Sequence, residues 1–317
     1  MRHYQAINLY RNLILCILVS FDMLYGISMR EQNETKSLME VKVILVKAFT
    51  KNIYAGNPAG VILNADELNS TEMQSISMQL GFSECVFVSE SRQAEFRFRY
   101  FTPTSEVDAC AHATIAACHV LTEERIESFE TNKGTYSVSI GPDDYITLEQ
   151  DKPTFGDKVS KIRVAKLFGI SHKKIREDWP CMVASTGVPK LMVPITDLET
   201  LLGIEPDLKA ISDFCFYYPC KGIYLFTTET MDQNSFAHAR QFNPLYGIDE
   251  DPITGIAAGA LGAYFANLNM VEPYYDIEQG YCMGKSGIVR VYASGWTNQP
   301  VKIRGQAVIY GERVLTV

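Results

Sequence analysis

The sequence predicts an α+β fold, because segments typical of strands outnumber segments typical of helices along most of the chain. A repeat adds to this prediction. Phe101-Thr-Pro103 and Phe242-Asn-Pro244 lie 141 positions apart, and the same offset carries Ile115-Ala-Ala117 onto Ile256-Ala-Ala258. We expect one helix-bearing sheet to occur twice, with chance as the alternative because alanine and isoleucine are common in helices.

The first half is expected at residues 39–153, where Met39 precedes a regular strand pattern. Apolar residues at helical spacing predict helices at Glu67–Gln79 and His112–Leu121. Apolar runs separated by turn signals such as Gly56-Asn-Pro predict strands at Val41–Phe49, Gly60–Leu63, Cys85–Val88, Phe96–Phe101, Thr135–Ile140 and Tyr145–Leu148.

The second half is expected at residues 154–317, after Pro153. Helical patterns occur here at Ile162–Leu167 and Thr254–Asn267. The same kind of apolar run predicts strands at Cys181–Ala184, Lys190–Pro194, Gly222–Thr227 and Gly287–Ala293.

The segment 1–38 is expected to be an extension that precedes the fold. Two arginines flank its polar start, and residues 1–28 weakly resemble a signal peptide. The apolar run Leu13–Phe21 is about half the ~20 residues that a membrane-spanning helix requires, and Asp22 interrupts it. We therefore expect no stable membrane anchor, while an export signal and a dispensable extension with Met39 as the initiator both stay open.

Composition excludes several classes of protein. The 317 residues are 47% hydrophobic and 21% charged, which is typical of globular proteins and disfavours disorder. A formal net charge of -8 would repel a phosphate backbone, so nucleic acid is not expected as a partner. The eight cysteines include no C-x-x-C pair and the five histidines supply no ligand set at zinc spacing. We expect no metal, and reduced thiols in a cytoplasmic protein.

Motifs of several common enzyme classes are also absent from the sequence. It contains no Gly-x-x-x-x-Gly-Lys-Ser/Thr phosphate loop, no strand-linked Gly-x-Gly-x-x-Gly and no Gly-x-Ser-x-Gly. Nucleotide hydrolysis, hydride transfer and serine hydrolysis are therefore unsupported.

Each unit of the repeat has a strand, a Phe-x-Pro turn, a short acidic loop and a helix rich in small residues. The first turn of a helix has free N–H groups and roughly half a positive charge, so it binds carboxylates and developing enolate oxygens. Two such helix starts can face one cleft and hold a small acid. From the alanines alone, buried packing helices explain the pattern equally well.

A set of short motifs occurs in a fixed order from about residue 40 to the C-terminus. They are Ala48-Phe49, Gly56-Asn-Pro-Ala-Gly-Val61, Phe82-Ser-Glu-Cys-Val-Phe87, Phe101-Thr-Pro-Thr-Ser-Glu-Val-Asp-Ala-Cys-Ala-His-Ala-Thr114, Ser185-Thr-Gly187, Phe242-Asn-Pro-Leu-Tyr-Gly-Ile-Asp-Glu-Asp-Pro-Ile-Thr-Gly255, Gly262-Ala-Tyr264, Gln279-Gly280 and Met283-Gly284. The ordered set resembles the phenazine-biosynthesis PhzF-like family, which shares the diaminopimelate epimerase fold.

The resemblance implies two similar halves, each a β-sheet curled around a central helix, with the active site in the cleft between them. It also implies a cofactor-independent isomerase that transfers a proton on a small carboxylic acid, and a homodimer. On this resemblance Glu84 is the general acid/base, His112 is the loop histidine and Asp251 is the second-half aspartate. Cys110 matches the first cysteine of the two-cysteine epimerases, and Asp251 occupies the place of their second thiol.

Two residues depart from the pattern of that family. Ala111 replaces the usual glycine after Cys110, and its bulk would restrict the approach of an anion to the backbone. Ile256 replaces a serine whose hydroxyl would contact the ligand. Both departures put the full family activity in doubt and leave open a binding or partner protein with reduced catalysis.

Each candidate residue also has a plainer explanation. Glu84 stands in an apolar frame that would raise its pKa, unless it is a solvated strand-edge glutamate. His112 is at a predicted helix start, where the dipole favours a neutral imidazole, unless it is structural. Asp251, followed by Pro252, fits a helix N-cap as well as a catalytic group.

The remaining candidates concern ligand binding. Cys110 is either a thiolate activated by a helix start or a buried inert thiol, and without a second cysteine two-thiol racemisation is excluded. Asn57 reaches the ligand or holds its turn. Thr254 and Gly255 offer backbone N–H groups to a carboxylate or simply begin a helix. Dehydration of a hydroxy acid and racemisation with one thiol stay open as other reactions in the same cleft.

Overall fold

Strands dominate the chain, as the sequence predicts. The computed structural model describes residues 39–124, 126–294 and 298–317, so the proposed extension 1–38 lies outside the described residues. None of the helices in the described part is both long and apolar enough to cross a membrane. The strands before residue 150 are β1 (Glu40–Ala48), β2 (Asn57–Ile62), β3 (Glu84–Glu90), β4 (Phe96–Phe101), β5 (Glu106–Val107), β6 (Ser128–Thr131), β7 (Gly134–Ile140) and β8 (Ile146–Glu149).

The strand β3, which begins at Glu84, is an interior strand with a neighbouring strand on each side. It pairs in parallel with β2 on one side and antiparallel with β4 on the other. Every residue of β2 is buried, as is typical of a strand covered on both faces. Strand β1 instead alternates buried and exposed side chains at its start and pairs antiparallel with β2. Glu84, the first residue of β3, therefore lies largely in the interior.

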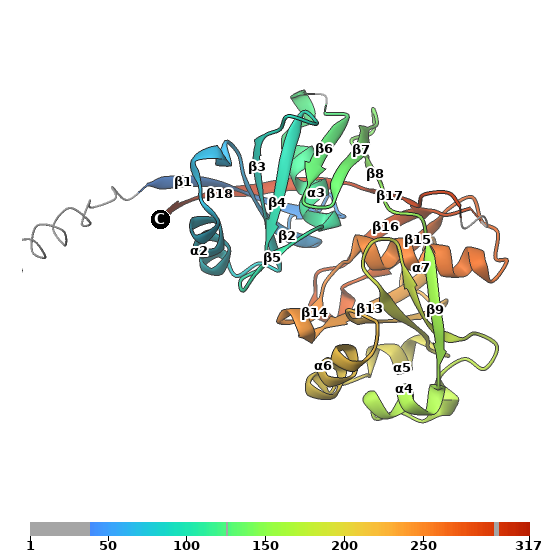
Figure 1. Cartoon of the computed structure of the whole chain (residues 1–317). Coiled ribbons are helices and arrows are strands. Elements are labelled where there is room, and N and C mark those ends of the chain that lie inside the picture. The colour runs from blue at the N-terminus through green and yellow to red at the C-terminus, as the bar shows by residue number, and fades with distance from the viewer. Residues whose placement is uncertain (1–38, 125, 295–297) are drawn as a thin grey trace, which may run out of the picture. The chain divides into compact units, whose positions relative to one another are not determined.

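The later strands continue the pairing and return to the first sheet. They are β9 (Thr154–Val159), β10 (Cys181–Ser185), β11 (Lys190–Pro194), β12 (Ile223–Thr227), β13 (Ala237–Asn243), β14 (Ile248–Asp251), β15 (Tyr275–Gln279), β16 (Gly287–Tyr292), β17 (Lys302–Gly305) and β18 (Ala307–Thr316). Strand β17 pairs antiparallel with β8, and β18 pairs with β1. The last strands, red in Figure 1, thus lie among the first.

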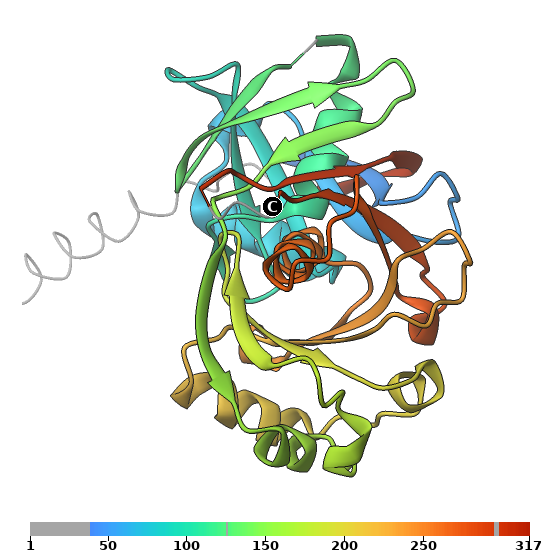
Figure 2. The ribbon, with the colours of Figure 1, turned by 90° about the vertical axis from the view of Figure 1, so that its right-hand side faces the viewer.

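Two helices, α3 (Ala111–Val120) and α7 (Gly255–Asn267), are apolar around almost their whole circumference. Such a helix is stable only when it is buried on all sides. Helix α3 packs on β1, β2, β3 and β8, and α7 packs on β10, β11, β16 and β17. Figure 2 looks along α7, in orange, and shows strands passing on several sides of it.

These two helices are in contact, and the contact includes their first residues, Ala111 and Gly255. A Cβ atom at Gly255 would lie only 2.8 Å from the Cβ of Ala111, so glycine is needed for this close approach. The two helix starts are therefore neighbours, and their positive ends point at the same part of the molecule.

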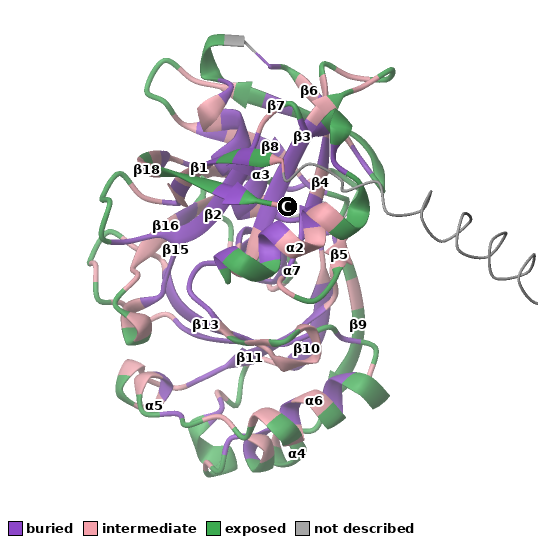
Figure 3. Cartoon of the chain, turned by 90° about the vertical axis from the view of Figure 1, so that its left-hand side faces the viewer, coloured by how far each residue is buried: buried purple, intermediate pink, exposed green. Residues whose placement is uncertain are grey.

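The other α-helices lie on the outside of the sheets. They are α2 (Ser70–Leu80), α4 (Lys161–Leu167), α5 (Leu198–Leu202) and α6 (Leu208–Tyr217). Asn69 forms a capping box with Glu72 and thereby fixes the start of α2. Figure 3 shows buried residues on the central strands and exposed residues on the outer faces of these helices.

Most predicted elements are confirmed, and the differences have physical causes. The helix expected at Glu67–Gln79 begins at Ser70, because the residues before Asn69 form a separate 3-10 turn at Ala65–Glu67. Strands β5, β6, β9, β13, β14, β15, β17 and β18 were not predicted. For β13 and β15 the reason is that they bury polar side chains in place of an apolar run. Buried His238 of β13 pairs with Glu278 of β15 at 2.7 Å.

The order of elements expected from the repeat is present in both parts of the chain. Strand β4 ends at Phe101 and is followed by β5 and α3, while β13 ends at Asn243 and is followed by β14 and α7. Helix α7 begins at Gly255, three residues later than the 141-residue offset gives for Ala111. The boundary between residues 153 and 154 stays a prediction.

Candidate active site

A cavity of about 350 Å³ lies at the starts of α3 and α7. Strands β3, β11 and β14 each contribute a terminal residue to its wall: Glu84, Lys190 and Asp251. The structure thereby brings together eight of the residues singled out in the sequence. They are Glu84, Cys110, Ala111, His112, Asp251, Thr254, Gly255 and Ile256.

Among the acids of this cavity that are not exposed, Glu84 has the least satisfied carboxyl group. Its side chain is 14% exposed, and its buried Oε2 atom has no hydrogen-bond partner among the described residues. Burial, reinforced by the charge of Asp251, raises the pKa of Glu84 to about 8. Because β3 is an interior strand, the alternative of a solvated strand-edge glutamate is wrong. The pKa shift has the expected direction.

The His112 ring lies between Glu84 and Cys110. Its Nε2 is 3.6 Å from Glu84 Oε2, and its Nδ1 is 3.3 Å from Cys110 Sγ. Burial lowers the pKa of His112 to about 3, so the imidazole is neutral. The neutral state is the one expected, although burial accounts for it and the helix dipole was the expected cause.

Cys110 precedes α3 as its N-cap residue and is buried. Burial, with a further contribution from Glu84, raises the pKa of its thiol well above the usual value. A thiol in this state stays protonated near neutral pH, which removes the nucleophilic form. The structure therefore favours the inert alternative for Cys110.

Asn57 contacts two residues that line the cavity, His112 of α3 and Asp251 of β14, without lining the cavity itself. Its fully buried amide donates to Asp251 Oδ1 at 2.7 Å and to the carbonyl of Ile253 at 2.9 Å. The same Nδ2 atom is 3.3 Å from His112 Nδ1. Asn57 is not among the described residues that line the cavity. Its contacts orient His112 and Asp251, and they leave no direct route from its amide to a ligand.

Asp251 ends β14 and is not the N-cap of α7. The N-cap is Thr254, so the capping explanation of Asp251 is wrong. The extra residues 252–254 form a turn in which the Thr254 hydroxyl donates to Asp251 Oδ2. Burial raises the pKa of Asp251 to about 6, and hydrogen bonds from Thr254 and Asn57 oppose the rise. In contrast to Glu84, Asp251 accepts hydrogen bonds on both oxygens.

Gln279 is a residue whose role the sequence did not reveal. Its Nε2 donates to the Asp251 carbonyl at 2.6 Å, and its Oε1 accepts from Thr254 N at 3.2 Å and from Tyr224 OH at 2.9 Å. The Thr254 amide is therefore already bonded within the protein, contrary to the expectation that it serves a ligand. Gly255 and Ile256 are in the first turn of α7, where backbone N–H groups lack intrahelical acceptors, and their contact with a ligand stays a prediction.

Lys190 is a second residue that the sequence did not identify. It is 3% exposed and lines the cavity at the start of β11. Burial lowers its pKa to about 8, and the charge of Asp251 opposes this change. The sequence contained one indication of Lys190, namely a charged residue directly before an apolar strand. Glu84, which precedes the apolar run Cys85–Val88, shows the same pattern.

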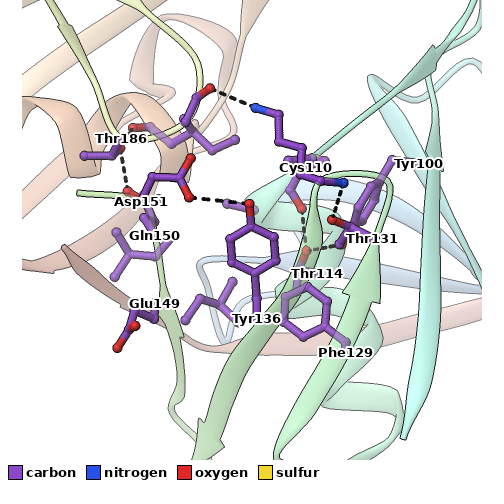
Figure 4. A pocket seen from close by; sticks show the side chains of 17 residues that line it. Tyr100, Cys110, Thr114, Phe129, Thr131, Tyr136, Glu149, Gln150, Asp151 and Thr186 are labelled. Carbon is purple, nitrogen blue, oxygen red and sulfur yellow. Dashed lines mark hydrogen bonds between the residues drawn. The ribbon is translucent and has the colours of Figure 1, made fainter. Parts of the chain in front are cut away.

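A smaller cavity of about 60 Å³ shares Cys110, Ala111 and Ile256 with the larger one. Figure 4 shows aromatic side chains including Phe129 and Tyr136 on one wall and Gln150 with Thr186 on another. Two acceptors lie within reach of the single Thr186 hydroxyl proton: Gln150 Oε1 at 2.7 Å and the Ile256 carbonyl at 3.2 Å. Ala111 and Ile256, the two departures from the family pattern, are thus wall residues of both cavities.

Three side chains of the site offer metal-binding atoms. One ligand atom each from Glu84, Cys110 and His112 lies within 4.8 Å of the others. Cysteine binds metals as the thiolate, and the raised pKa of Cys110 disfavours that form. The expectation that no metal is needed stays a prediction.

The architecture is that of epimerase-like folds. A hydroxyproline epimerase from Agrobacterium vitis matches with a TM-score of 0.60 over 88% of this chain and 92% of its own, at 11% sequence identity. A PhzF-family phenazine biosynthesis protein from Bacillus anthracis matches with a TM-score of 0.81, 30% identity and coverage of 88% and 100%.

The sequence comparisons give the family. The model of the phenazine biosynthesis-like proteins, PhzC-PhzF, matches residues 46–313, and the chain belongs to this family. The uncharacterized isomerase YfhB of Bacillus subtilis is 35% identical over 88% of this chain and all of its own. The trans-2,3-dihydro-3-hydroxyanthranilate isomerase of Pseudomonas chlororaphis is 27% identical over 86% of this chain and 99% of its own.

Proposed function

We propose that this chain isomerises a small carboxylic acid by proton transfer, with Glu84 as general acid and base and no cofactor. The curated relatives carry isomerase names, so the enzyme class expected from the sequence agrees with the class of its family. The substrate carboxylate binds at the adjoining starts of α3 and α7. The observation that carries the proposal is the buried, unpartnered Oε2 atom of Glu84 in the cavity wall.

Proton transfer requires a group that both accepts and releases a proton near neutral pH. A carboxyl group with a pKa of about 8 does both, whereas an ordinary glutamate holds its proton too weakly. Glu84 takes a proton from a substrate carbon, and the electron pair of the broken C–H bond moves toward the bound carboxylate. Return of the proton at another position, or on the other face, completes the isomerisation.

The helix starts stabilise the charge that develops in this step. The N–H groups of the first helical turns lack intrahelical acceptors and carry partial positive charge. Donors already fixed in place favour an enolate-like oxygen without reorganisation. Neutral His112, 3.6 Å from Glu84, relays or orients the proton, and Asp251 holds Thr254 and Asn57 in position.

The proposal is tested in two stages. Small amino, hydroxy and cyclic acids, with trans-2,3-dihydro-3-hydroxyanthranilate among them, are first screened for a rise in melting temperature, since a ligand of the native state stabilises it. Acids that bind are then incubated with the enzyme in D₂O and analysed by NMR and mass spectrometry. Deuterium incorporation without loss of water is expected; loss of water would instead indicate a dehydratase.

The decisive variant is Glu84→Gln, which keeps the size of the side chain and removes its acid/base function. Its matched control is Glu90→Gln, which changes the exposed glutamate at the other end of β3. We expect deuterium exchange to disappear in the first variant and to persist in the second, with both proteins folded. Undiminished exchange in Glu84→Gln would reject the role of Glu84.

Tight ligand binding without any exchange in the wild-type chain would favour the alternative of a binding protein. In that case Ala111→Gly and Ile256→Ser test whether the bulk of these wall residues suppresses catalysis. Deuterium exchange in the double variant would indicate an isomerase whose activity these two residues suppress. No exchange in the double variant would indicate a binding protein.

Three further features belong to the proposal. We expect residues 39–153 and 154–317 to form two similar halves around the cavity, which superposition of α3 and its sheet on α7 and its sheet would test. A homodimer is expected, and light scattering measures it. The cytoplasmic location stays a prediction that fractionation can test.

A further inference from the structure

We propose that Lys190 binds a second acidic group of the substrate, so that the preferred substrates are small dicarboxylic acids. This inference rests on the proposed function, because it takes the two helix starts as the site of the first carboxylate. The basis is the juxtaposition, in one cavity, of those helix starts with a buried ammonium group that has no counter-ion at contact distance.

Lys190 is placed by the sheet itself. Strand β12 is parallel to β11 and antiparallel to β13. The first residues of β11 and β12 and the last residue of β13 therefore lie at the same end of the sheet. Lys190 begins β11, Lys221 precedes β12 and Asn243 ends β13. All three residues line the cavity.

The ammonium group of Lys190 is held by neutral acceptors. Its Nζ donates to the backbone carbonyl of Lys221 and to Asn243 Oδ1, both at 3.0 Å. An ammonium group has three N–H donors, so these two bonds leave one for a ligand. These two hydrogen bonds also hold the ammonium group in one orientation, so its side chain loses less conformational entropy when a ligand binds.

The local backbone is built to hold Asn243 in this position. Gly222 has φ +145°, and a Cβ atom there would lie 2.2 Å from Asn243 Oδ1 and 2.9 Å from the Phe242 carbonyl. A side chain at position 222 would therefore displace the amide oxygen that accepts from Lys190. Gly222 thus leaves the space in which Asn243 accepts the hydrogen bond from Lys190.

Charge is the strongest part of the argument. Within the described part of the chain, no carboxylate lies within 4.0 Å of the Nζ of Lys190, Lys133 or Lys221, the three lysines that line the cavity. Exposed lysines elsewhere have such partners, as Lys174 has Asp197 at 3.1 Å. A buried charge is costly unless an opposite charge pairs with it.

The four carboxyl groups that line the same cavity do not fill this role: Glu106 pairs with Arg99 at 2.8 Å, and Asp108 is exposed. The oxygens of Asp251 accept from Asn57 and Thr254, and its attraction to Lys190 acts at longer range. Glu84 is held largely in its neutral form by burial. An anionic group of the ligand is the partner that completes the site, and a cavity of about 350 Å³ limits the ligand to a small molecule.

The test compares matched acids on the full chain. Butanoate, pentanoate and hexanoate are titrated beside succinate, glutarate and adipate, with binding measured by calorimetry and by melting temperature. For at least one chain length we expect the dicarboxylate to bind ten or more times tighter than its monocarboxylate. Equal affinities, or no binding by any of the six acids, would overturn the proposal.

The variant Lys190→Gln keeps a donor for the two carbonyl acceptors and removes the charge. It should lose the preference for dicarboxylates while its affinity for monocarboxylates changes less than about twofold. Lys209→Gln removes the same charge from the exposed face of α6 and should keep the preference. Should Lys190→Gln fold and still prefer dicarboxylates, the assignment is wrong.

Gly222→Ala gives a second test that retains the lysine. It displaces Asn243 and should weaken dicarboxylate binding selectively, which also covers the case in which Lys190→Gln does not fold. Because these assays need no proton transfer, Glu84→Gln should keep the preference. A preference for dicarboxylates in the wild-type chain without any deuterium exchange would remove the proposed isomerase and leave Lys190 as the second binding group.

Discussion

Two buried acids face the same cavity from different strands, and they differ in what surrounds their oxygens. Asp251 accepts hydrogen bonds from Asn57 and Thr254, while Glu84 keeps one oxygen without a hydrogen-bond partner among the described residues. The pKa of Asp251 is raised only to about 6, and that of Glu84 to about 8. A carboxylate that other side chains hold by hydrogen bonds serves to position its neighbours, whereas an acid with an oxygen that accepts no hydrogen bond can exchange its proton with a ligand.

The largest expected effect separates the two acids by activity. Glu84→Gln should lower the rate of deuterium exchange by about 10³-fold or more, as expected when a general acid/base is removed. Asp251→Asn keeps one acceptor oxygen for Asn57 or Thr254 and should lower the rate by about 10-fold to 100-fold, since misplaced groups weaken catalysis without abolishing it. Equal losses in the two variants would contradict the division of roles.

The second effect separates them by stability. Asp251→Ala leaves the buried Asn57 amide and the Thr254 hydroxyl without their acceptor, which should lower the free energy of unfolding by about 1–3 kcal/mol. Asp249→Ala, an exposed change on the same strand, is the control. Urea unfolding followed by circular dichroism measures both. A wild-type midpoint in Asp251→Ala would show that the hydrogen bonds of Asp251 are not structural.

The third effect is the pH dependence of stability. Glu84 has a pKa of about 8 in the folded chain against 4.5 as its ordinary value, so the folded state binds this proton more tightly. The resulting stabilisation is complete below pH 4.5 and is lost as the pH rises through 8. Glutamine has no proton to lose, so the melting temperature of Glu84→Gln relative to wild type should rise between pH 4.5 and 8.5.

The control for this pH series is Glu90→Gln, whose melting temperature relative to wild type should stay constant. Scanning calorimetry in overlapping buffers measures all three proteins. A constant difference between Glu84→Gln and wild type would mean that Glu84 is hydrated in the folded chain, contrary to its partner-free oxygen.

The smallest effect concerns the Cys110 thiol. Because the raised pKa of Cys110 keeps it protonated, Cys110→Ala should change the exchange rate less than about threefold, and a chelator should have no effect. A 100-fold loss in the variant would restore racemisation with one thiol as a candidate, and sensitivity to the chelator would point to the three metal-binding atoms.

Part of this comparison could be predicted from the sequence. Glu84 stands before an apolar strand, and His112 stands at a helix start, so their burial follows from local patterns. The contacts of Asn57, Gln279 and Lys190 could not be predicted, because each joins segments that are far apart in the chain. Asn57 and Asp251, for example, are 194 residues apart and are joined only through the pairing of distant strands.

The failed expectation about capping has a specific cause. The repeat was aligned without a gap, but α7 begins three residues later than that alignment requires. The additional turn moves Asp251 from the helix start to the end of β14, where it faces Asn57. Small insertions of this kind change the role of a residue and leave no mark in hydrophobic periodicity.

The return of β18 to pair with β1 has a consequence for biosynthesis. During translation β1 leaves the ribosome with one of its edges unprotected, because its neighbour β18 is made only after β17. Unpaired strand edges are prone to association with other chains, and such long-range closure is slow. Truncation near the C-terminus should therefore yield a chain that aggregates during synthesis, even where the catalytic groups are all present.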